Sequence, residues 1–255
     1  MVTLAVTGAA GRMGRAVLAA AAARETVEVA FAVNRSAVDE PISGVAVEPN
    51  SEFEALLAAH EPDVVVDFTG PESAVGYATA CADRGVAFVT GTTGFDATGL
   101  AALDRASEST ALLKASNFSR GVAALRLAVR EATAALPDAD IELTETHHNA
   151  KRDAPSGTAK TLLDDIETVR GDLTERVHGR EGEAPRNSTE IGVHARRAGD
   201  IAGEHEVLIA GSNEVLSLTH RAGDRSIFAE GALDAAVWLA ARDAGRYDFF
   251  AVIEG

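Results

Sequence analysis

Short β-rich runs alternate with helical segments from Val2 to about Asn117, and this alternation restricts the possible folds more than any other feature. The strand-like runs are Val2–Val6, Val27–Val33, Val64–Phe68, Val86–Val89 and Ala111–Lys114. Between them, Ser51-Glu52-Phe53-Glu54 has the form of a helix-capping box, and Pro71 suits a first helical turn. Strands that alternate with helices form a parallel sheet with helices on its faces. The sequence therefore predicts a doubly wound α/β domain.

The pattern changes after Ser119. A helical stretch reaches Leu136, and Pro137 ends it. The segments expected next are a strand over Ile141–Thr146, a helix from Ser156 to about Val169, a loop over Gly171–Asn187, and strands over Thr189–Arg196, Glu204–Ala210 and Glu214–His220. Strands that follow one another without helices predict an inserted α+β domain with an open mixed sheet.

The last part of the chain is helical over Arg225–Arg242 and has a strand-like run over Phe249–Ile253. We expect this segment to pack back on the first domain. The predicted organisation is therefore a dinucleotide-binding domain of residues 1–118 plus 229–255, with a substrate-binding domain of residues 119–228 inserted into it.

The charge balance limits the possible partners. Lys and Arg number 23 and Asp and Glu 39, so the net charge is −16, which opposes nucleic-acid binding. Only three lysines occur, and this acid-rich, lysine-poor composition suggests a high-salt cytoplasm. The single cysteine, Cys81, excludes an internal disulfide and a multi-cysteine metal site. Because no leader or membrane-spanning pattern is found, a cytoplasmic location is expected.

A glycine-rich turn follows the first strand and opens a helix over Arg15–Ala23. It consists of Gly8, Ala9, Ala10, Gly11, Arg12, Met13 and Gly14. Such a turn lets the backbone approach a pyrophosphate, whose charge is met by N–H groups at the helix N-terminus. The alternative is an ordinary strand-to-helix turn, but its place before a βαβ alternation favours a Rossmann-like dinucleotide site.

The end of the second strand indicates which dinucleotide binds. An acidic residue that holds the ribose hydroxyls is common at this place, but here the residues are Asn34 and Arg35. Asn34 can still bond a ribose, while Arg35 offers a planar fork to a 2′-phosphate. NADPH is therefore favoured over NADH, with use of both possible. The alternative is that Arg35 is a solvated loop arginine.

Two further loops follow the ends of predicted strands, where ligands bind in open α/β sheets. They contain Gly91, Thr92 and Thr93 after the fourth strand, and Ser116, Asn117 and Phe118 after the fifth. Hydroxyl and amide groups suit a nicotinamide and its ribose. The same residues also form ordinary turns and helix caps.

The segment from Glu145 to Thr158 concentrates positive charge in this acidic chain. His147, His148, Lys151 and Arg152 lie within six residues, which indicates a small anionic substrate. Ser156, Gly157 and Thr158 then open a helix and form a potential carboxylate cradle. His147 can donate a proton near neutral pH, with Lys151 nearby to bind a carboxylate or share the transfer. A solvated basic loop that caps a helix is the other interpretation, and a metal site is excluded by the spacing of the histidines.

With these motifs, the sequence resembles the dihydrodipicolinate reductase family along nearly its whole length. The resemblance is carried by Gly8–Gly14, Asp67–Pro71, Gly91–Phe95, Asn117–Ser119, His147–Thr158 and Arg197–His205. It implies reduction of a cyclic imine dicarboxylate, 4-hydroxy-tetrahydrodipicolinate, by NADPH or NADH in the diaminopimelate route to lysine. It also implies a homotetramer assembled through the sheet of the second domain, with a domain closure during turnover.

The resemblance assigns roles by position. His147 and Lys151 match the family's proton-donor pair, while His148 and Ser156-Gly157-Thr158 match contacts to the substrate carboxylates. The cofactor loops match Gly8–Met13, Gly91–Thr93 and Ser116–Phe118. Many members carry Glu-Arg after the second strand, so Asn34-Arg35 departs from the pattern and favours NADPH.

Two other functions remain at this point. A regulator could bind NADP(H) through the same glycine turn without catalysis, but it would not need the basic segment from His147 to Thr158. Another Rossmann amino-acid dehydrogenase would require a different set of basic residues from the one present.

Overall fold

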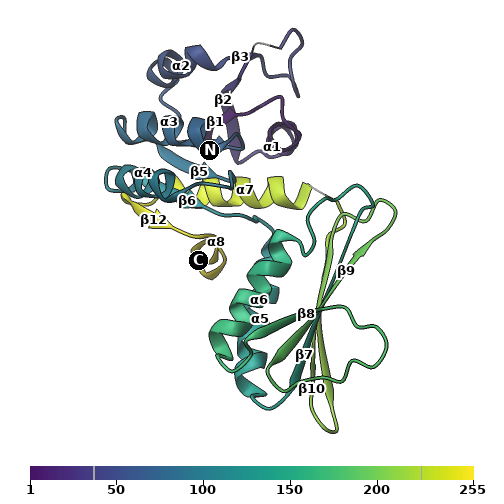
Figure 1. Cartoon of the computed structure of the whole chain (residues 1–255). Coiled ribbons are helices and arrows are strands. Elements are labelled where there is room, and N and C mark those ends of the chain that lie inside the picture. The colour runs from purple at the N-terminus through teal and green to yellow at the C-terminus, as the bar shows by residue number, and fades with distance from the viewer. Residues whose placement is uncertain (37, 225) are drawn as a thin grey trace. The chain divides into compact units, whose positions relative to one another are not determined.

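The computed structural model describes residues 1–36, 38–224 and 226–255, and these form two compact units. Unit 1 consists of Met1–Ser119 with Arg225–Gly255, and unit 2 consists of Arg120–Asp224. Each unit has its own sheet and its own buried core, with long-range strand pairing inside it (Figure 1).

Unit 1 contains a seven-stranded sheet in which all neighbouring strands are parallel. Its strands are β1 (Val2–Thr7), β2 (Val27–Asn34), β3 (Val47–Pro49), β4 (Val64–Asp67), β5 (Ala87–Thr90), β6 (Ala111–Lys114) and β12 (Gly245–Tyr247). Their order is β12-β6-β5-β4-β1-β2-β3, so the chain turns in opposite directions from the central pair β1 and β4. Ligands of doubly wound sheets bind at the carboxyl ends of strands at such a reversal.

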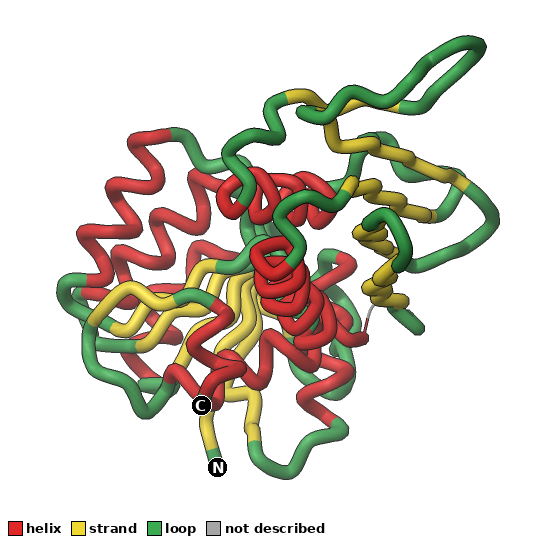
Figure 2. Tube along the Cα trace, turned by 90° about the horizontal axis from the view of Figure 1, so that it is seen from below, coloured by secondary structure: helices red, strands yellow, loops and turns green. Residues whose placement is uncertain are grey.

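Helices cover both faces of this sheet (Figure 2). They are α1 (Arg12–Ala22), α2 (Phe53–His60), α3 (Pro71–Ala82), α4 (Ala97–Ser107), α7 (Ser226–Leu239) and α8 (Phe249–Glu254). Side chains of α2, α3 and α4 share one core with the sheet, while α1 packs against α7. Because both faces are buried, β4 begins with three consecutive buried valines rather than an alternating pattern.

Unit 2 contains a five-stranded mixed sheet with two helices. The strands are β7 (Asp140–His147), β8 (Glu175–His178), β9 (Glu190–Arg197), β10 (Glu204–Ala210) and β11 (Val215–Arg221), and the helices are α5 (Arg120–Ala135) and α6 (Gly157–Val169). Apolar residues of α5 and α6 pack against alternate residues of β7, β9 and β10. The strand order is β11-β10-β7-β9-β8, with β7, β9 and β8 parallel and the pairs of β10 antiparallel.

The architecture confirms the predicted doubly wound parallel sheet and the second, mixed sheet, but several local predictions are wrong. The expected strand over Phe249–Ile253 is the helix α8, because the Asp248 side chain accepts hydrogen bonds from the N–H groups of Phe250 and Ala251 and starts a helix. The last strand, β12, lies just before it. The expected loop over Gly171–Asn187 contains the strand β8, which pairs with β9.

Three further differences concern element boundaries. Ser51-Glu52-Phe53-Glu54 is not a capping box, because a 3₁₀ turn over Asn50–Glu52 leads directly into α2. The first helix begins at Arg12 rather than Arg15, and the short strand β3 was not predicted. The predicted helix start at Arg225 lies outside the described residues. Within the described residues, α7 begins at Ser226. Within the described ranges, no helix is both long enough and apolar enough to cross a membrane.

Candidate active site

The turn between β1 and α1 has room only for glycine at two positions, Gly8 and Gly14. Gly8 has a φ of 70°, and a Cβ on it would lie 2.7 Å from the carbonyl oxygen of Phe68. A Cβ on Gly14 would lie 2.2 Å from the carbonyl oxygen of Gly8, so α1 packs directly on the turn. Among the described residues, no side chain caps α1 at Gly11. The open N–H groups of this helix start fit the pyrophosphate of a dinucleotide.

A buried carboxylate holds together the strand ends beside this turn. Asp67 is fully buried at the end of β4. Its Oδ1 accepts hydrogen bonds from the hydroxyls of Thr7 and Thr69 at 2.7 and 2.6 Å, and its Oδ2 accepts from Thr90 and Thr92, both at 2.7 Å. Asp67 thereby links β1, β4 and β5 at the edge of the sheet where ligands are expected.

Two of these hydroxyls also accept hydrogen bonds from the backbone. The N–H of Thr69 donates to Thr92 Oγ1 at 3.1 Å, and the N–H of Thr92 donates to Thr90 Oγ1 at 3.0 Å. A carboxylate only accepts, so Thr90 and Thr92 must donate their hydroxyl protons to Asp67 and use their oxygen lone pairs for these N–H groups. The loops that follow β4 and β5 are therefore fixed by a single carboxylate, which the sequence patterns did not indicate.

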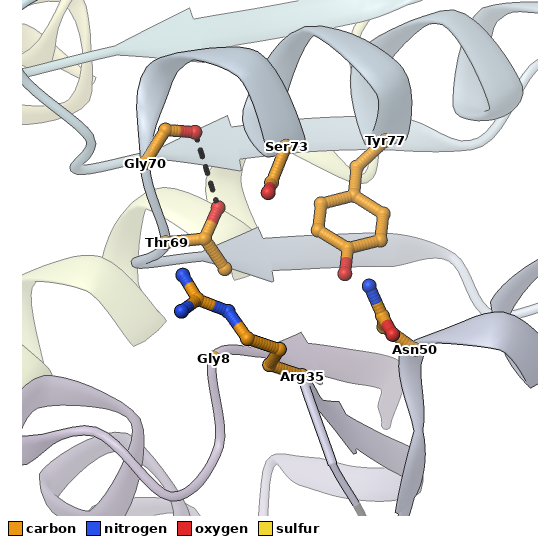
Figure 3. A pocket seen from close by; sticks show the side chains of 7 residues that line it. All are labelled: Gly8, Arg35, Asn50, Thr69, Gly70, Ser73 and Tyr77. Carbon is orange, nitrogen blue, oxygen red and sulfur yellow. Dashed lines mark hydrogen bonds between the residues drawn. The ribbon is translucent and has the colours of Figure 1, made fainter.

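A cavity of about 260 Å³ opens next to the glycine turn (Figure 3). It is lined by Gly8, Arg35, Asn50, Thr69, Gly70, Ser73 and Tyr77. The Arg35 guanidinium points towards Thr69 and Ser73, and the Asn50 amide faces the Tyr77 hydroxyl (Figure 3). Arg35 is the only charged residue among these lining residues, so the cavity suits an anionic group. The Asn34 amide instead donates to the carbonyl oxygen of Ser36 at 3.4 Å.

The other predicted cofactor residues of unit 1 differ in exposure. Ala9 is buried and Ala10 is partly buried, whereas Gly11 and Arg12 are exposed and Met13 is partly exposed. Because the Ala9 side chain is buried, the backbone of the turn is the part that can contact a ligand.

The loops after β5 and β6 show the same division. Thr93 is exposed, whereas the Thr92 hydroxyl is used by Asp67. Ser116 is exposed, and the Asn117 side chain accepts from the N–H of Ser119 at 2.8 Å. The Phe118 ring is buried against Phe68 and Phe249. Thr92 and Phe118 therefore support their loops with their side chains and can offer a cofactor only backbone groups.

In unit 2, the predicted basic segment connects the end of β7 to the start of α6. Lys151 Nζ lies 2.7 Å from Asp153 Oδ1, and the turn is closed by a hydrogen bond from the Lys151 N–H to the His148 carbonyl oxygen. The Ser156 side chain caps α6 by accepting from the N–H of Ala159 at 3.1 Å. Gly157, the first residue of α6, is exposed. The segment thus combines a lysine ammonium group with a helix N-terminus, both of which attract a carboxylate.

His147 lies at the end of β7, next to an ion pair between Glu145 and Arg197. Its Nδ1 is 2.6 Å from Oε2 of Glu145, which is fully buried. Arg197 donates to both oxygens of Glu145, at 2.8 and 2.7 Å. Burial alone would raise the pKa of Glu145, but the hydrogen bonds from Arg197 and His147 more than offset this and hold that pKa below its usual value.

The pKa of His147 is lowered from its ordinary value, chiefly by burial, which outweighs the opposing effect of Glu145. The charges of Lys151 and Arg197 lower this pKa further. His205 packs edge-on against His147 with ring centroids 5.2 Å apart, and its Nε2 lies 3.0 Å from Ser156 Oγ. Burial, with a smaller effect of His147, lowers the pKa of His205 to about 3. Both imidazoles are therefore neutral in the free protein at neutral pH.

Comparison with known proteins agrees with this arrangement. A family model described as "Dihydrodipicolinate reductase, N-terminus" matches residues 2–118, and one described as "Dihydrodipicolinate reductase, C-terminus" matches residues 121–253. The chain belongs to the dihydrodipicolinate reductase family. Members of this family are pyridine nucleotide-dependent reductases of lysine and diaminopimelate biosynthesis, so the chain is an oxidoreductase.

Individual relatives match the whole chain. The 4-hydroxy-tetrahydrodipicolinate reductase of Natronomonas pharaonis is 54% identical over 244 residues, which cover 96% of this chain and 97% of the relative. That of Haloarcula marismortui is 53% identical over 254 residues and covers 100% of both chains. A dipicolinate-bound dihydrodipicolinate reductase from Paenisporosarcina sp. TG-14 has a TM-score of 0.82 at 24% identity, with 97% of each chain covered, and shares the fold.

In this member of the family, the two predicted sets of residues lie in different units. Those predicted to bind the cofactor lie in unit 1, and those predicted to bind or protonate the substrate lie in unit 2. The sequence patterns missed Asp67, Glu145 and His205. For Glu145 a signal was available, since residues two apart on a strand lie on one face, which places Glu145 beside His147.

Proposed function

We propose that this dihydrodipicolinate reductase converts 4-hydroxy-tetrahydrodipicolinate to tetrahydrodipicolinate with NADPH or NADH. In each turnover the substrate gains one hydride and one proton, and its hydroxyl group leaves as water. The reduced nicotinamide supplies the hydride when it is bound. The chain must therefore bind a dinucleotide, hold a dicarboxylate and deliver a proton.

Unit 1 is proposed as the dinucleotide-binding domain. The glycine turn fits the pyrophosphate, because any side chain at Gly8 or Gly14 would collide with backbone. Thr93 and Ser116 are exposed on the loops after β5 and β6, where they can bond the nicotinamide and its ribose. Asn34 remains a candidate for the adenosine ribose if its side chain turns from Ser36.

NADPH is proposed as the preferred cofactor because of the cavity beside the glycine turn. Arg35 faces Ser73 across this cavity, and no described lining residue carries a negative charge. A 2′-phosphate would gain a planar guanidinium partner there, whereas NADH would leave the charge of Arg35 without a partner from the cofactor.

Unit 2 is proposed as the substrate-binding domain. The dicarboxylate would bind Lys151, His148 and the start of α6 at Ser156-Gly157-Thr158. The Lys151 ammonium is already paired with Asp153, which is half exposed, so a substrate carboxylate can replace Asp153 as its partner. Ser156 contributes by shaping the loop, since its N–H donates to Glu145 and its hydroxyl caps α6. His147 is the proposed proton donor, with Lys151 as its partner in the transfer.

We further propose that the enzyme is a cytoplasmic homotetramer that assembles through the sheet of unit 2. Val215 and Leu216 of the edge strand β11 are 62% and 37% exposed, and the free edge of this strand offers backbone groups for pairing. Pairing of such an edge with another copy would remove these side chains from water.

The basic segment from His147 to Thr158 is the observation that carries the proposed reaction, because a protein that only sensed NADP(H) would not need it. The test is an assay with freshly synthesised 4-hydroxy-tetrahydrodipicolinate, in which the loss of reduced-nicotinamide absorbance is followed with NADPH and NADH separately, at low and at multimolar salt. We expect substrate-dependent oxidation. Cofactor binding without any oxidation would instead support the regulator.

The cofactor preference has its own test in the variant Arg35→Gln. Removing the guanidinium should raise the KM for NADPH by about tenfold, the loss of about 1.4 kcal/mol expected for one charge-assisted contact. The KM for NADH should not rise. Arg105→Gln, which changes an exposed arginine of α4, is the matched control. An equal effect of Arg35→Gln on both cofactors would contradict the 2′-phosphate assignment.

A further inference from the structure

We propose that the buried Glu145 and its partner Arg197 form a positioning pair, which fixes the His147 side chain in the tautomer with hydrogen on Nδ1 and so presents Nε2 for proton transfer. The proposal rests on the proposed function in one respect, that His147 is the proton donor. Its structural part, the tautomer, stands on the geometry of unit 2 alone.

The strand pairing brings the three side chains together. Glu145 and His147 lie on the same face of β7 because they are two residues apart. Arg197 ends β9, which runs parallel to β7, and is the register partner of His147. The Arg197 side chain therefore extends from the end of β9 to the Glu145 carboxylate, which is fully buried.

All polar contacts of Glu145 require it to act as an acceptor. Oε1 accepts from Arg197 Nη2 at 2.7 Å and from the Ser156 N–H at 3.1 Å. Oε2 accepts from Arg197 Nη1 at 2.8 Å and lies 2.6 Å from His147 Nδ1. The arginine and the backbone amide can only donate, so the carboxylate is ionised and has no proton to give. Nδ1 of His147 must then carry the hydrogen, and a neutral imidazole has none left for Nε2.

The other side of the ring is kept open by a glycine. A Cβ on Gly203 would lie 3.0 Å from His147 Nε2, so any larger residue at this position would cover the nitrogen. His147 itself is 8% exposed, which shields the ring while leaving a narrow approach. The unprotonated Nε2 is therefore the atom that can take up a proton from solvent and pass it to the substrate.

Arg197 has a second effect, on charge. Without it, the negative Glu145 would favour a proton on His147 more strongly, against the burial that lowers the pKa of His147. The guanidinium neutralises Glu145, and the groups that face His147 are then Lys151, which is positive, and His205, which is neutral. The free enzyme thus has a neutral His147, and the two negative charges of an arriving dicarboxylate would favour protonation of Nε2. Nε2 takes up a proton from solvent and then transfers the same proton to the substrate, which returns the imidazole to its neutral form.

A purely structural role for the pair must be distinguished, since Arg197 also donates to the Asp153 carbonyl oxygen at 2.5 Å and so ties down the basic segment. A structural role would change folding or substrate binding but would not select a tautomer. The decisive measurement is therefore the protonation state of each His147 nitrogen, from nuclear magnetic resonance of the enzyme with isotopically labelled histidine. The His147 signal is assigned by its loss in His147→Asn.

In the wild-type protein at neutral pH we expect hydrogen on Nδ1 and none on Nε2. Glu145→Gln should remove this preference, because an amide can donate to Nδ1 as well as accept from it. It should also lower kcat by about 100-fold, in the range of general acid catalysis, with the KM for NADPH unchanged. The pH profile of kcat should shift in this variant, because the charge that faces Nδ1 is lost.

The matched control is Glu142→Gln. Glu142 lies on the same strand, and its Oε2 is 2.7 Å from Nε2 of another histidine, His194. This variant removes a glutamate–histidine pair without touching His147, so it should keep both the His147 tautomer and kcat.

Hydrogen on Nε2 in the wild-type protein would overturn the proposal, even if Glu145→Gln did not fold. Retention of both the tautomer and kcat in Glu145→Gln would overturn it as well. The tautomer needs no turnover to be observed, so a wild-type protein with hydrogen on Nδ1 but no reductase activity would contradict the proposed function and not the positioning pair.

Discussion

Each unit of the molecule contains a fully buried carboxylate at the end of a central strand, and the two are held in opposite ways. Asp67 in unit 1 accepts from four threonine hydroxyls, all neutral. Glu145 in unit 2 accepts from Arg197, His147 and one backbone N–H. The first arrangement fixes loops without a titratable hydrogen-bond partner, whereas the second places charge next to His147, the proposed proton donor.

The difference matches the function that we propose for each unit. A dinucleotide site must keep its shape, and hydroxyl donors provide fixed directions with no dependence on pH near neutrality. A proton-transfer site needs a group whose protonation responds to its surroundings. Because Arg197 offsets the charge of Glu145, His147 is neutral and can gain a proton when a negative substrate arrives. Under the proposed function, the chain therefore separates rigid cofactor binding in unit 1 from proton transfer in unit 2.

The largest effects on stability are expected when the charge of either buried carboxylate is removed. Glu145→Gln leaves the Arg197 guanidinium without its partner and should cost unit 2 about 3–5 kcal/mol of stability. Asp67→Asn keeps the shape but turns one acceptor into a donor, so two hydroxyls lose their acceptor, at a cost to unit 1 of about 1–3 kcal/mol. Hydrogen exchange measured strand by strand should show faster exchange in β7 and β9 for the first variant and in β1, β4 and β5 for the second.

Controls for these two variants lie in the same units. Asp63→Asn changes an exposed carboxylate that accepts from the N–H and hydroxyl of Thr3, and Glu142→Gln changes a partly exposed one on β7. Both should have smaller effects than the buried counterparts. A larger loss for Asp67→Asn than for Glu145→Gln would show that the neutral and charged arrangements do not differ as argued.

The second prediction concerns turnover. Lys151→Ala should lower kcat by about 100-fold, through loss of a substrate contact and of a partner in proton transfer, while the Kd of NADPH stays unchanged. Lys160→Ala removes an exposed lysine of α6 and should leave kcat near the wild-type value. Steady-state kinetics and a separate titration of NADPH binding check both parts. Unchanged turnover in Lys151→Ala would remove this residue from the proposed mechanism.

The sequence predicts the two sheets, and it offers candidate sites where the signal is local. The glycine turn and the segment from His147 to Thr158 are each contained within about a dozen residues, and their spacing reflects backbone geometry. The error at Phe249–Ile253 has a local cause too: the run is apolar enough for a strand, but the Asp248 side chain caps a helix there. Short apolar runs do not distinguish the two structures.

The two buried carboxylates were missed because their partners are distant in the chain. Arg197 is 52 residues from Glu145, and Thr7 is 60 residues from Asp67. A single acidic residue in a strand looks like an exposed position until the pairing of β7 with β9, or of β1 with β4, is known. Tertiary pairing, rather than residue type, creates these sites.

The last prediction concerns acid sensitivity, which we expect in unit 2. His205 is buried beside His147, and burial lowers its pKa to about 3, whereas in an unfolded chain it would titrate near its ordinary value of 6.5. Between these two pH values the unfolded chain holds one more proton than the folded protein, so stability falls as the pH falls. The slope for one proton is about 1.4 kcal/mol per pH unit.

His205→Gln should therefore flatten the pH dependence of stability, whatever its effect on stability at neutral pH, because glutamine has no proton to gain. The measurement is amide hydrogen exchange of β10 between about pH 6 and 4, which gives the free energy of opening after correction for intrinsic exchange rates. His178→Gln, which changes an exposed histidine of β8, should keep the wild-type slope. If the slopes of wild type and His205→Gln were equal, His205 would already be charged in the folded protein at pH near 6, and the neutral surroundings assigned to His147 would have to be abandoned with it.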